Sequence, residues 1–206
     1  MTTLLPAVLS ISAFLIAITF HEFCHALAAY KLGDSTAQRM GRLTLNPLSH
    51  IDPLGLLCMI FIGIGWARPV PMNPNNLKFP RFYSVLIGLA GPFSNFFLAL
   101  LSLFILQYVP VNLTSSLYIS LMPFFTLLAR INIMLGLFNL LPIPPLDGSH
   151  LLRAVIPQNW ESVYNTVQQI SIIFLLILVS TTGFRKTFNK AMNRTLTLFQ
   201  NIVSRA

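Results

Sequence analysis

The sequence predicts an all-α polytopic membrane protein, and composition and segment length lead to this fold class. Hydrophobic residues make up 55% of the 206 residues and charged residues only 9%, against about 25% charged residues in ordinary soluble domains. Several apolar segments are long enough to cross the hydrocarbon core, which takes roughly 20 helical residues. We therefore expect one membrane-embedded domain over residues 1–206 that contains a bundle of about four to six membrane segments.

The charge balance argues against nucleic acid as a partner. A net charge of +8 arises from 13 basic and five acidic residues. These bases are spread between apolar segments, and the interleaving of basic and aromatic residues that binds nucleic acid is missing. Membrane topology and anionic lipid head groups account for the bases more simply, so the lipid bilayer is the expected partner.

The first apolar segment, from Leu4 to about Lys31, is predicted to be a retained transmembrane helix that carries an H-E-x-x-H motif. On a helix His21 and His25 lie one turn apart on one face, as two imidazole ligands of one metal ion require. Glu22 lies beside the first histidine, where its carboxylate could take a proton from water. Cys24 lies off this face and is expected to pack. Because ionisable residues are costly inside a membrane, the motif indicates a functional site.

Between the first two full spans we expect a re-entrant or short strand element. Residues 33–53 are polar, and the alternation over Arg42–Leu45 indicates one short strand. The apolar run over residues 54–66 is too short to span a bilayer comfortably. A run that does not span keeps the bases of residues 68–81 on the same side as Lys31, and the positive-inside rule makes that side cytoplasmic.

Further helices are predicted over residues 82–109, 117–141, 149–156 and 170–184. The small residues over 88–91 allow neighbouring helices to approach closely. The segment over 117–141 ends at three prolines within residues 142–145, which forbid a regular helix. Apolar residues recur at helical spacing in the basic tail, residues 185–206, which is predicted to form an amphipathic helix on the membrane surface.

A catalytic zinc ion usually has three protein ligands, and the sequence offers several candidates for the third. Asp147 is favoured because it follows the proline-broken helix, where irregular backbone at membrane depth predicts a cavity. Asp52, with His50 two residues before it, is an alternative in a turn. His150 lies one helical turn after Asp147 and is another alternative.

Two motifs carry a resemblance to a known family. His21-Glu22-Phe23-Cys24-His25, taken together with residues 139–148 (Asn-Leu-Leu-Pro-Ile-Pro-Pro-Leu-Asp-Gly), resembles the site-2 protease family of intramembrane zinc metalloproteases. That family pairs H-E-x-x-H with N-x-x-P-x-x-P-L-D-G on a later helix. Residues 46–53 and 90–95 also resemble the small bacterial members that lack a PDZ or CBS domain. The resemblance covers residues 10 to about 180.

The resemblance implies a zinc endopeptidase that hydrolyses peptide bonds within or near transmembrane segments of membrane-protein substrates. Zinc would be bound by His21, His25 and Asp147, and Glu22 would be the general base. Asn139 would support the substrate or the oxyanion, and the candidates for supporting the ligands are His50 and Asn95. The protein would lie in the bacterial inner membrane with its active site towards the cytoplasm. Two alternatives stay open: an inactive homologue that binds membrane clients, and a metal-ion transporter.

Overall fold

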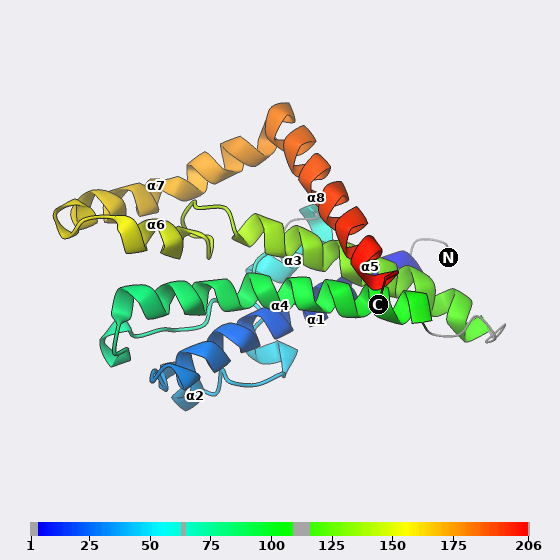
Figure 1. Cartoon of the computed structure of the whole chain (residues 1–206), viewed down its shortest axis with the longest axis horizontal. Coiled ribbons are helices and arrows are strands. Elements are labelled where there is room, and N and C mark those ends of the chain that lie inside the picture. The colour runs from blue at the N-terminus through cyan, green and yellow to red at the C-terminus, as the bar shows by residue number, and fades with distance from the viewer. Residues whose placement is uncertain (1–3, 63–64, 109–115, 206) are drawn as a thin grey trace.

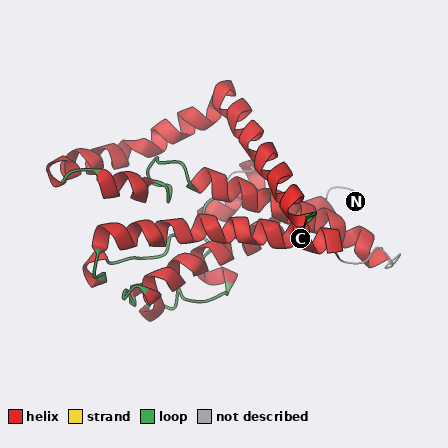
Figure 2. Ribbon diagram, in the orientation of Figure 1, coloured by secondary structure: helices red, strands yellow, loops and turns green. Residues whose placement is uncertain are grey.

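The computed structural model describes residues 4–62, 65–108 and 116–205, and in these ranges the regular elements are all helical (Figures 1 and 2). The α-helices are α1 (Leu4–Lys31), α2 (Thr36–Arg39), α3 (Pro53–Ile62), α4 (Pro80–Tyr108), α5 (Ser116–Asn139), α6 (Ser149–Val155), α7 (Glu161–Ser180) and α8 (Thr182–Val203). The 3-10 turns are η1 (Pro47–Ser49), η2 (Pro74–Asn76) and η3 (Gln158–Trp160). Among the described helices α1, α4, α5 and α7 are long and apolar enough to cross a membrane. The predicted all-α polytopic membrane fold is confirmed.

The helices α1, α4 and α5 form the central bundle of the molecule (Figure 1). Helix α4 packs against both of the others, and α1 also contacts α5. On α1 the fully buried positions are small, namely Ala13, Ala17, Ala26 and Ala29. Small side chains let helix backbones approach closely where lipid provides no hydrophobic drive for association. The bundle is therefore tight along the helix that carries H-E-x-x-H.

The element between the first two spans is helical. The strand predicted over residues 42–45 is wrong. Residues 43 and 44 form a bend, residues 42 and 45 have no regular structure, and the β-bridge within the described residues joins Ile51 to Ala67 instead. The side chain of Arg42 turns inward and donates hydrogen bonds to the carbonyl oxygens of Arg68 and Pro69. This contact joins Arg42 to the loop that follows α3, residues 67–79, which we call the second loop. The short element that does not span is α3, which has ten residues.

Asp34 joins the two polar loops that follow α1 and α3. It is fully buried, and its carboxylate accepts hydrogen bonds from the backbone N–H of Asn73 at 2.7 Å and from Nδ2 of Asn76 at 2.8 Å. Burial alone would raise the pKa of Asp34, but its hydrogen bonds, from Thr36 and Asn76 above all, lower the pKa below the ordinary value. A carboxyl whose pKa is lowered by folding stabilises the fold at neutral pH and loses that contribution as pH falls through its folded pKa.

The last two helices differ in part from the prediction. The apolar helix expected over 170–184 begins earlier, at Glu161, and ends at Ser180. Thr181 ends it, because this residue is extended and its side chain caps the next helix by accepting a hydrogen bond from the N–H of Phe184. Figure 1 shows α7 and α8 meeting at an angle beside the bundle.

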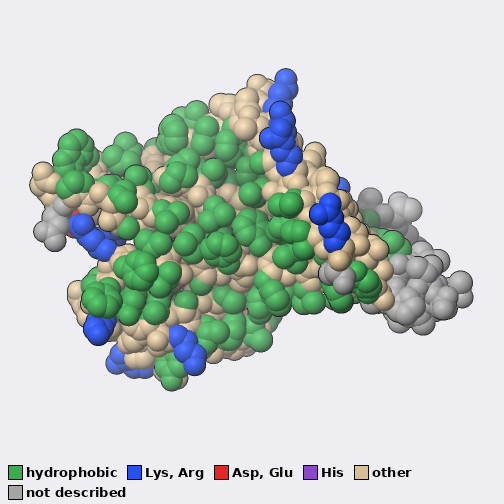
Figure 3. Space-filling model, in the orientation of Figure 1, with side chains coloured by type: hydrophobic (Ala, Val, Ile, Leu, Met, Phe, Trp, Pro, Cys, Tyr) green, Lys and Arg blue, Asp and Glu red, His purple; other side chains and the backbone are tan. Residues whose placement is uncertain are grey.

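The basic tail forms α8, as predicted, but its apolar face packs on the protein. Phe188 lies edge-to-face against Phe138 of α5, and Phe199 lies in the same way against Phe96 of α4. The hydroxyl of Tyr108 donates to the carbonyl oxygen of Val203 at 2.9 Å. The opposite face carries the lysines and arginines, which line the outer edge of α8 in Figure 3. The apolar stripe of the tail is therefore partly buried against the bundle, and its expected contact with the membrane surface stays a prediction.

Candidate metal centre

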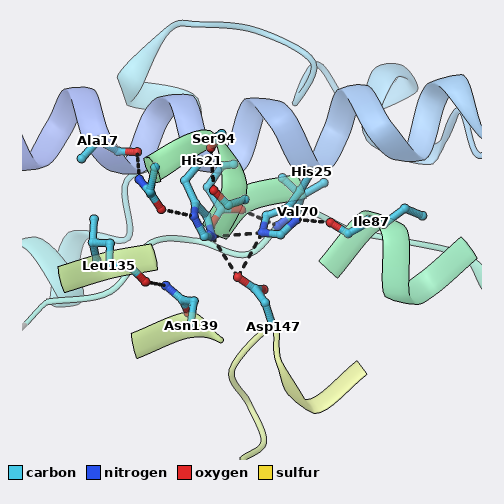
Figure 4. Close-up of polar contacts among 12 residues, drawn as sticks. Ala17, His21, His25, Val70, Ile87, Ser94, Leu135, Asn139 and Asp147 are labelled. Carbon is cyan, nitrogen blue, oxygen red and sulfur yellow. Dashed lines mark hydrogen bonds and ion pairs between the residues drawn. The ribbon is translucent and has the colours of Figure 1, made fainter. Parts of the chain in front are cut away.

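The two histidines of H-E-x-x-H lie side by side on α1 and point into the bundle (Figure 4). Their Nε2 atoms are 3.0 Å apart, and their rings meet edge-on at an interplanar angle of 83°. Both side chains are buried, with 6% of His21 and 8% of His25 exposed. The helical spacing alone accounts for this pairing, since residues four apart share one face.

Asp147 approaches the same point from the irregular segment after α5. Its Oδ2 atom lies 3.1 Å from Nε2 of His21 and 3.3 Å from Nε2 of His25. The backbone N–H of Gly148 donates to the carbonyl oxygen of Asn139 at 2.6 Å, which folds the segment back onto the end of α5. Prolines 142, 144 and 145 keep this segment out of a helix, because they supply no backbone donor.

Hydrogen bonds on the far side of each imidazole fix which nitrogen faces the site. Nδ1 of His21 lies 2.6 Å from Oδ1 of Asn95, whose Nδ2 donates to Oδ1 of Asn132 at 2.8 Å and to the carbonyl oxygen of Ala17. The Asn95 oxygen therefore faces His21 as an acceptor, so Nδ1 carries the hydrogen. Nδ1 of His25 likewise donates to the carbonyl oxygen of Ile87 at 2.7 Å. Both Nε2 atoms are left with free lone pairs.

Three acceptor atoms thus converge without a donor between them. Oδ2 of Asp147 is buried and has no hydrogen-bond partner within the described part of the chain. Two imidazole lone pairs and a carboxylate oxygen at this spacing repel one another unless a cation lies among them. A tetrahedral zinc ion with bonds of about 2.0–2.1 Å separates its ligand atoms by roughly 3.3 Å, which matches the separations here. His21, His25 and Asp147 fit a zinc ion and leave its fourth position open.

Helix α4 lies against the histidine pair at a glycine. A Cβ atom added at Gly91 would lie 2.6 Å from Nε2 of His21 and closer still to Nε2 of His25. Gly88, one turn earlier, faces the ring of His150 and the carbonyl oxygen of Asp147. The small residues predicted to allow close helix approach therefore make room for the candidate metal ligands. The small residues indicated close packing, but nothing in the sequence marked the histidine pair as its partner.

The carboxylate of Glu22 is buried beside the histidines and is held by the second loop. Its Oε2 atom accepts a hydrogen bond from the backbone N–H of Val70 at 3.0 Å, and the residue is 8% exposed. The other carboxylate oxygen is not used in this contact. Val70 was not a predicted site residue, because a backbone amide leaves no signal in residue type.

Other candidate residues have different surroundings. Nδ2 of Asn139 donates to the carbonyl oxygen of Leu135 in its own helix, so its amide caps the end of α5. His50 is a candidate for supporting the ligands, but its Nε2 lies 2.8 Å from the carbonyl oxygen of Thr44. Within the described residues it makes no hydrogen bond to His21, His25 or Asp147. Asp52 accepts from the N–H of Gly55 and starts α3. Of the two candidates for supporting the ligands, only Asn95 contacts one.

Asn95→Ala is expected to weaken zinc binding by about 10- to 100-fold, the usual cost of losing a residue that orients a metal ligand. Without the Asn95 oxygen, His21 can rotate or place its hydrogen on Nε2. Chelator competition with the purified protein measures the change. Ser102→Ala on the same helix is the matched control, because among the described residues its buried hydroxyl bonds to the carbonyl oxygen of Leu98 in that helix and to nothing else. Equal affinities for the two variants would contradict this role for Asn95.

Comparisons with known proteins relate the chain to zinc metalloproteases. The sequence profile described as peptidase family M50 matches residues 108–180. The chain is 39% identical over 173 residues to a Bacillus subtilis protein named "Putative zinc metalloprotease YwhC", an alignment that covers 82% of this chain and 79% of the relative. It is 31% identical to "Putative zinc metalloprotease Rip2" of Mycobacterium tuberculosis H37Rv, over 83% of this chain and 66% of the relative.

A more distant relative carries a similar name. "Zinc metalloprotease MJ0392" of Methanocaldococcus jannaschii is 26% identical over 160 residues, which cover 78% of this chain and 38% of the relative. No solved structure matches the chain significantly.

Proposed function

We propose that this chain, which belongs to peptidase family M50, the site-2 protease family of zinc metalloproteases, cleaves membrane proteins within or near their transmembrane segments. The observation that carries the proposal is the convergence of His21, His25 and Asp147 beside Glu22. This group lies among α1, α4 and α5, which are long and apolar enough to cross a membrane.

Each residue of the group has a role that its contacts support. His21, His25 and Asp147 would hold the zinc ion, which when bound supplies Lewis-acid activation of water and of the peptide carbonyl. Glu22 would accept the proton of the attacking water on the oxygen that does not bond to Val70, and would pass it to the leaving amine. Asn139 would assist the substrate only if its amide left the carbonyl of Leu135.

The surroundings of the centre favour a substrate that spans the membrane. A soluble peptide would have to enter a bundle that exposes many large hydrophobic side chains, as the face in Figure 3 shows. The polar loops 33–53 and 67–79 follow α1 and α3 at the end of α1 nearer the motif, where water could approach. Lys31, Arg39 and Arg42 lie at the same end, and by the positive-inside rule this end would face the cytoplasm of the cell whose inner membrane holds the protein.

The decisive experiment measures cleavage by the purified protein in proteoliposomes, with a panel of single-span model substrates. We expect fragments whose new termini, identified by mass spectrometry, lie within or beside the span. 1,10-Phenanthroline should stop the reaction and added zinc should restore it. His25→Ala is the negative control, because it removes a ligand. If the zinc-loaded parent protein cleaved every substrate no faster than His25→Ala does, the result would support the inactive client-binding alternative.

A further inference from the structure

A chain of contacts joins Arg42 to Glu22 across the second loop. The guanidinium of Arg42 donates from Nη2 to the carbonyl oxygen of Arg68 at 2.5 Å and from Nη1 to that of Pro69 at 3.3 Å. The next residue, Val70, donates its N–H to Oε2 of Glu22 at 3.0 Å. Arg42 is buried, with 6% of its surface exposed. The charged guanidinium is therefore hydrogen-bonded to the backbone of this loop.

The loop offers Glu22 one backbone donor in a restricted setting. Val70 lies between Pro69 and Pro71, and proline has no N–H, so Val70 provides the single amide hydrogen of this tripeptide. Both prolines also restrict the backbone, each at its own φ and at the residue before it. A shift of the loop by one residue in either direction would place a proline nitrogen at the carboxylate. The hydrogen bond to Glu22 therefore depends on the exact register of the loop.

Other contacts hold the loop near residues 67 and 73, and Arg42 holds the carbonyls of residues 68 and 69 between them. On one side the N–H of Arg68 donates to the carbonyl oxygen of His50 at 2.9 Å, next to the bridge between Ile51 and Ala67. On the other side Asn73 donates to Asp34. A buried guanidinium is costly unless it is hydrogen-bonded, and Arg42 uses its two terminal nitrogens on the carbonyls just before Val70.

We propose that Arg42 is a positioning residue of the metal centre, which acts on Glu22 through the Val70 amide. It holds the carbonyls of Arg68 and Pro69, and so places the Val70 N–H on one carboxylate oxygen of Glu22 and leaves the other free for the proton of water. This inference rests on the proposed peptidase function and adds a residue outside both sequence motifs. Fixed orientation of a proton acceptor is worth a large factor in rate, since small misplacements cost about 100-fold.

Two variants break the chain of contacts at different links. Arg42→Ala removes the two hydrogen bonds from the guanidinium to the carbonyls of residues 68 and 69, which we call the clamp. Val70→Pro removes the N–H that donates to Glu22 without altering Glu22 itself. Each is expected to lower kcat about 100-fold while KM and bound zinc stay at parental values, and the double variant should be no slower than either single one. Arg42→Lys should recover part of the loss. Arg39→Ala, an exposed arginine three residues earlier, is the matched control and should behave as the parent.

Two further measurements separate a positioning role from misfolding and from a wrong function. Val70→Ala keeps the N–H, so most of the kcat should remain. Its kcat should exceed that of Val70→Pro by about tenfold or more, given that Val70→Pro is expected to lose about 100-fold. Parental kcat in Val70→Pro, or losses that multiply in the double variant, would overturn the proposal. If the parent cleaves nothing, the proposed function fails, and hydrogen exchange then tests the clamp alone. Arg42→Ala should speed exchange over residues 67–73, and unchanged exchange there would refute it.

Discussion

Gly91→Ala is expected to remove zinc from the purified protein and to abolish cleavage. The added methyl group would lie 2.6 Å from Nε2 of His21 and nearer still to that of His25. These atoms are ring nitrogens held from behind by Asn95 and Ile87, so they cannot withdraw without breaking those hydrogen bonds. We expect zinc affinity to fall by more than about 100-fold, the upper end for losing one supporting residue. Elemental analysis and chelator competition measure it.

Alanine variants of two other glycines provide a control and an intermediate case for this prediction. Gly183→Ala adds a methyl group to α8 that would meet no described atom within 4 Å outside the backbone of its own helix and the adjoining residues, so zinc content should stay parental. Gly88→Ala meets the His150 ring at 2.7 Å and the carbonyl oxygen of Asp147 at 3.1 Å rather than the ring nitrogens of His21 and His25, so an intermediate loss is expected. If Gly91→Ala retained stoichiometric zinc while folding normally, α4 could not pack against the histidines as described.

Glu22→Gln is expected to lower kcat by about 10²- to 10⁴-fold, the usual contribution of a general base, while zinc stays bound. Glutamine has nearly the same shape, and its side-chain oxygen can still accept from Val70, so the loop contact is kept. What it loses is a basic oxygen for the proton of water. Cleavage of a single-span substrate and zinc content, measured on the same preparation, separate this loss from loss of the metal.

The comparison with a ligand variant makes the test for Glu22 specific. His25→Ala should lose both zinc and cleavage, whereas Glu22→Gln should lose cleavage alone. A Glu22→Gln protein that cuts at the parental rate would rule out a general-base role for this residue. The same variant, because it binds but does not cut, should retain uncleaved substrates in native membranes, where crosslinking can identify them.

Local features of the sequence predicted much of this protein. Three of the four candidate spans, α1, α4 and α5, follow from the length of the apolar runs, because a helix must satisfy its own backbone hydrogen bonds within a bilayer. His21 and His25 meet because four residues make about one helical turn. Prolines 142, 144 and 145 release the chain from a helix, and Asp147 lies where the chain turns back. These are effects of neighbouring residues, so a single sequence contains them.

Contacts between distant segments could not be predicted in the same way. Asn95 is 74 residues from His21, and Val70 is 48 residues from Glu22, so only packing decides that they meet. The strand expected near Arg42 fails because its side chain finds carbonyl acceptors in the second loop. Aromatic side chains of α8 likewise pack against α4 and α5, which the sequence of the tail alone did not indicate.

Neighbouring residues thus set the types of the candidate ligands and the helical spacing of His21 and His25. Contacts between distant segments set which lone pairs face the candidate metal position, how closely α4 approaches at Gly91 and which amide holds Glu22. Hydrogen bonds and close packing act over a few ångströms in space, whatever the separation along the chain, so one sequence does not reveal them.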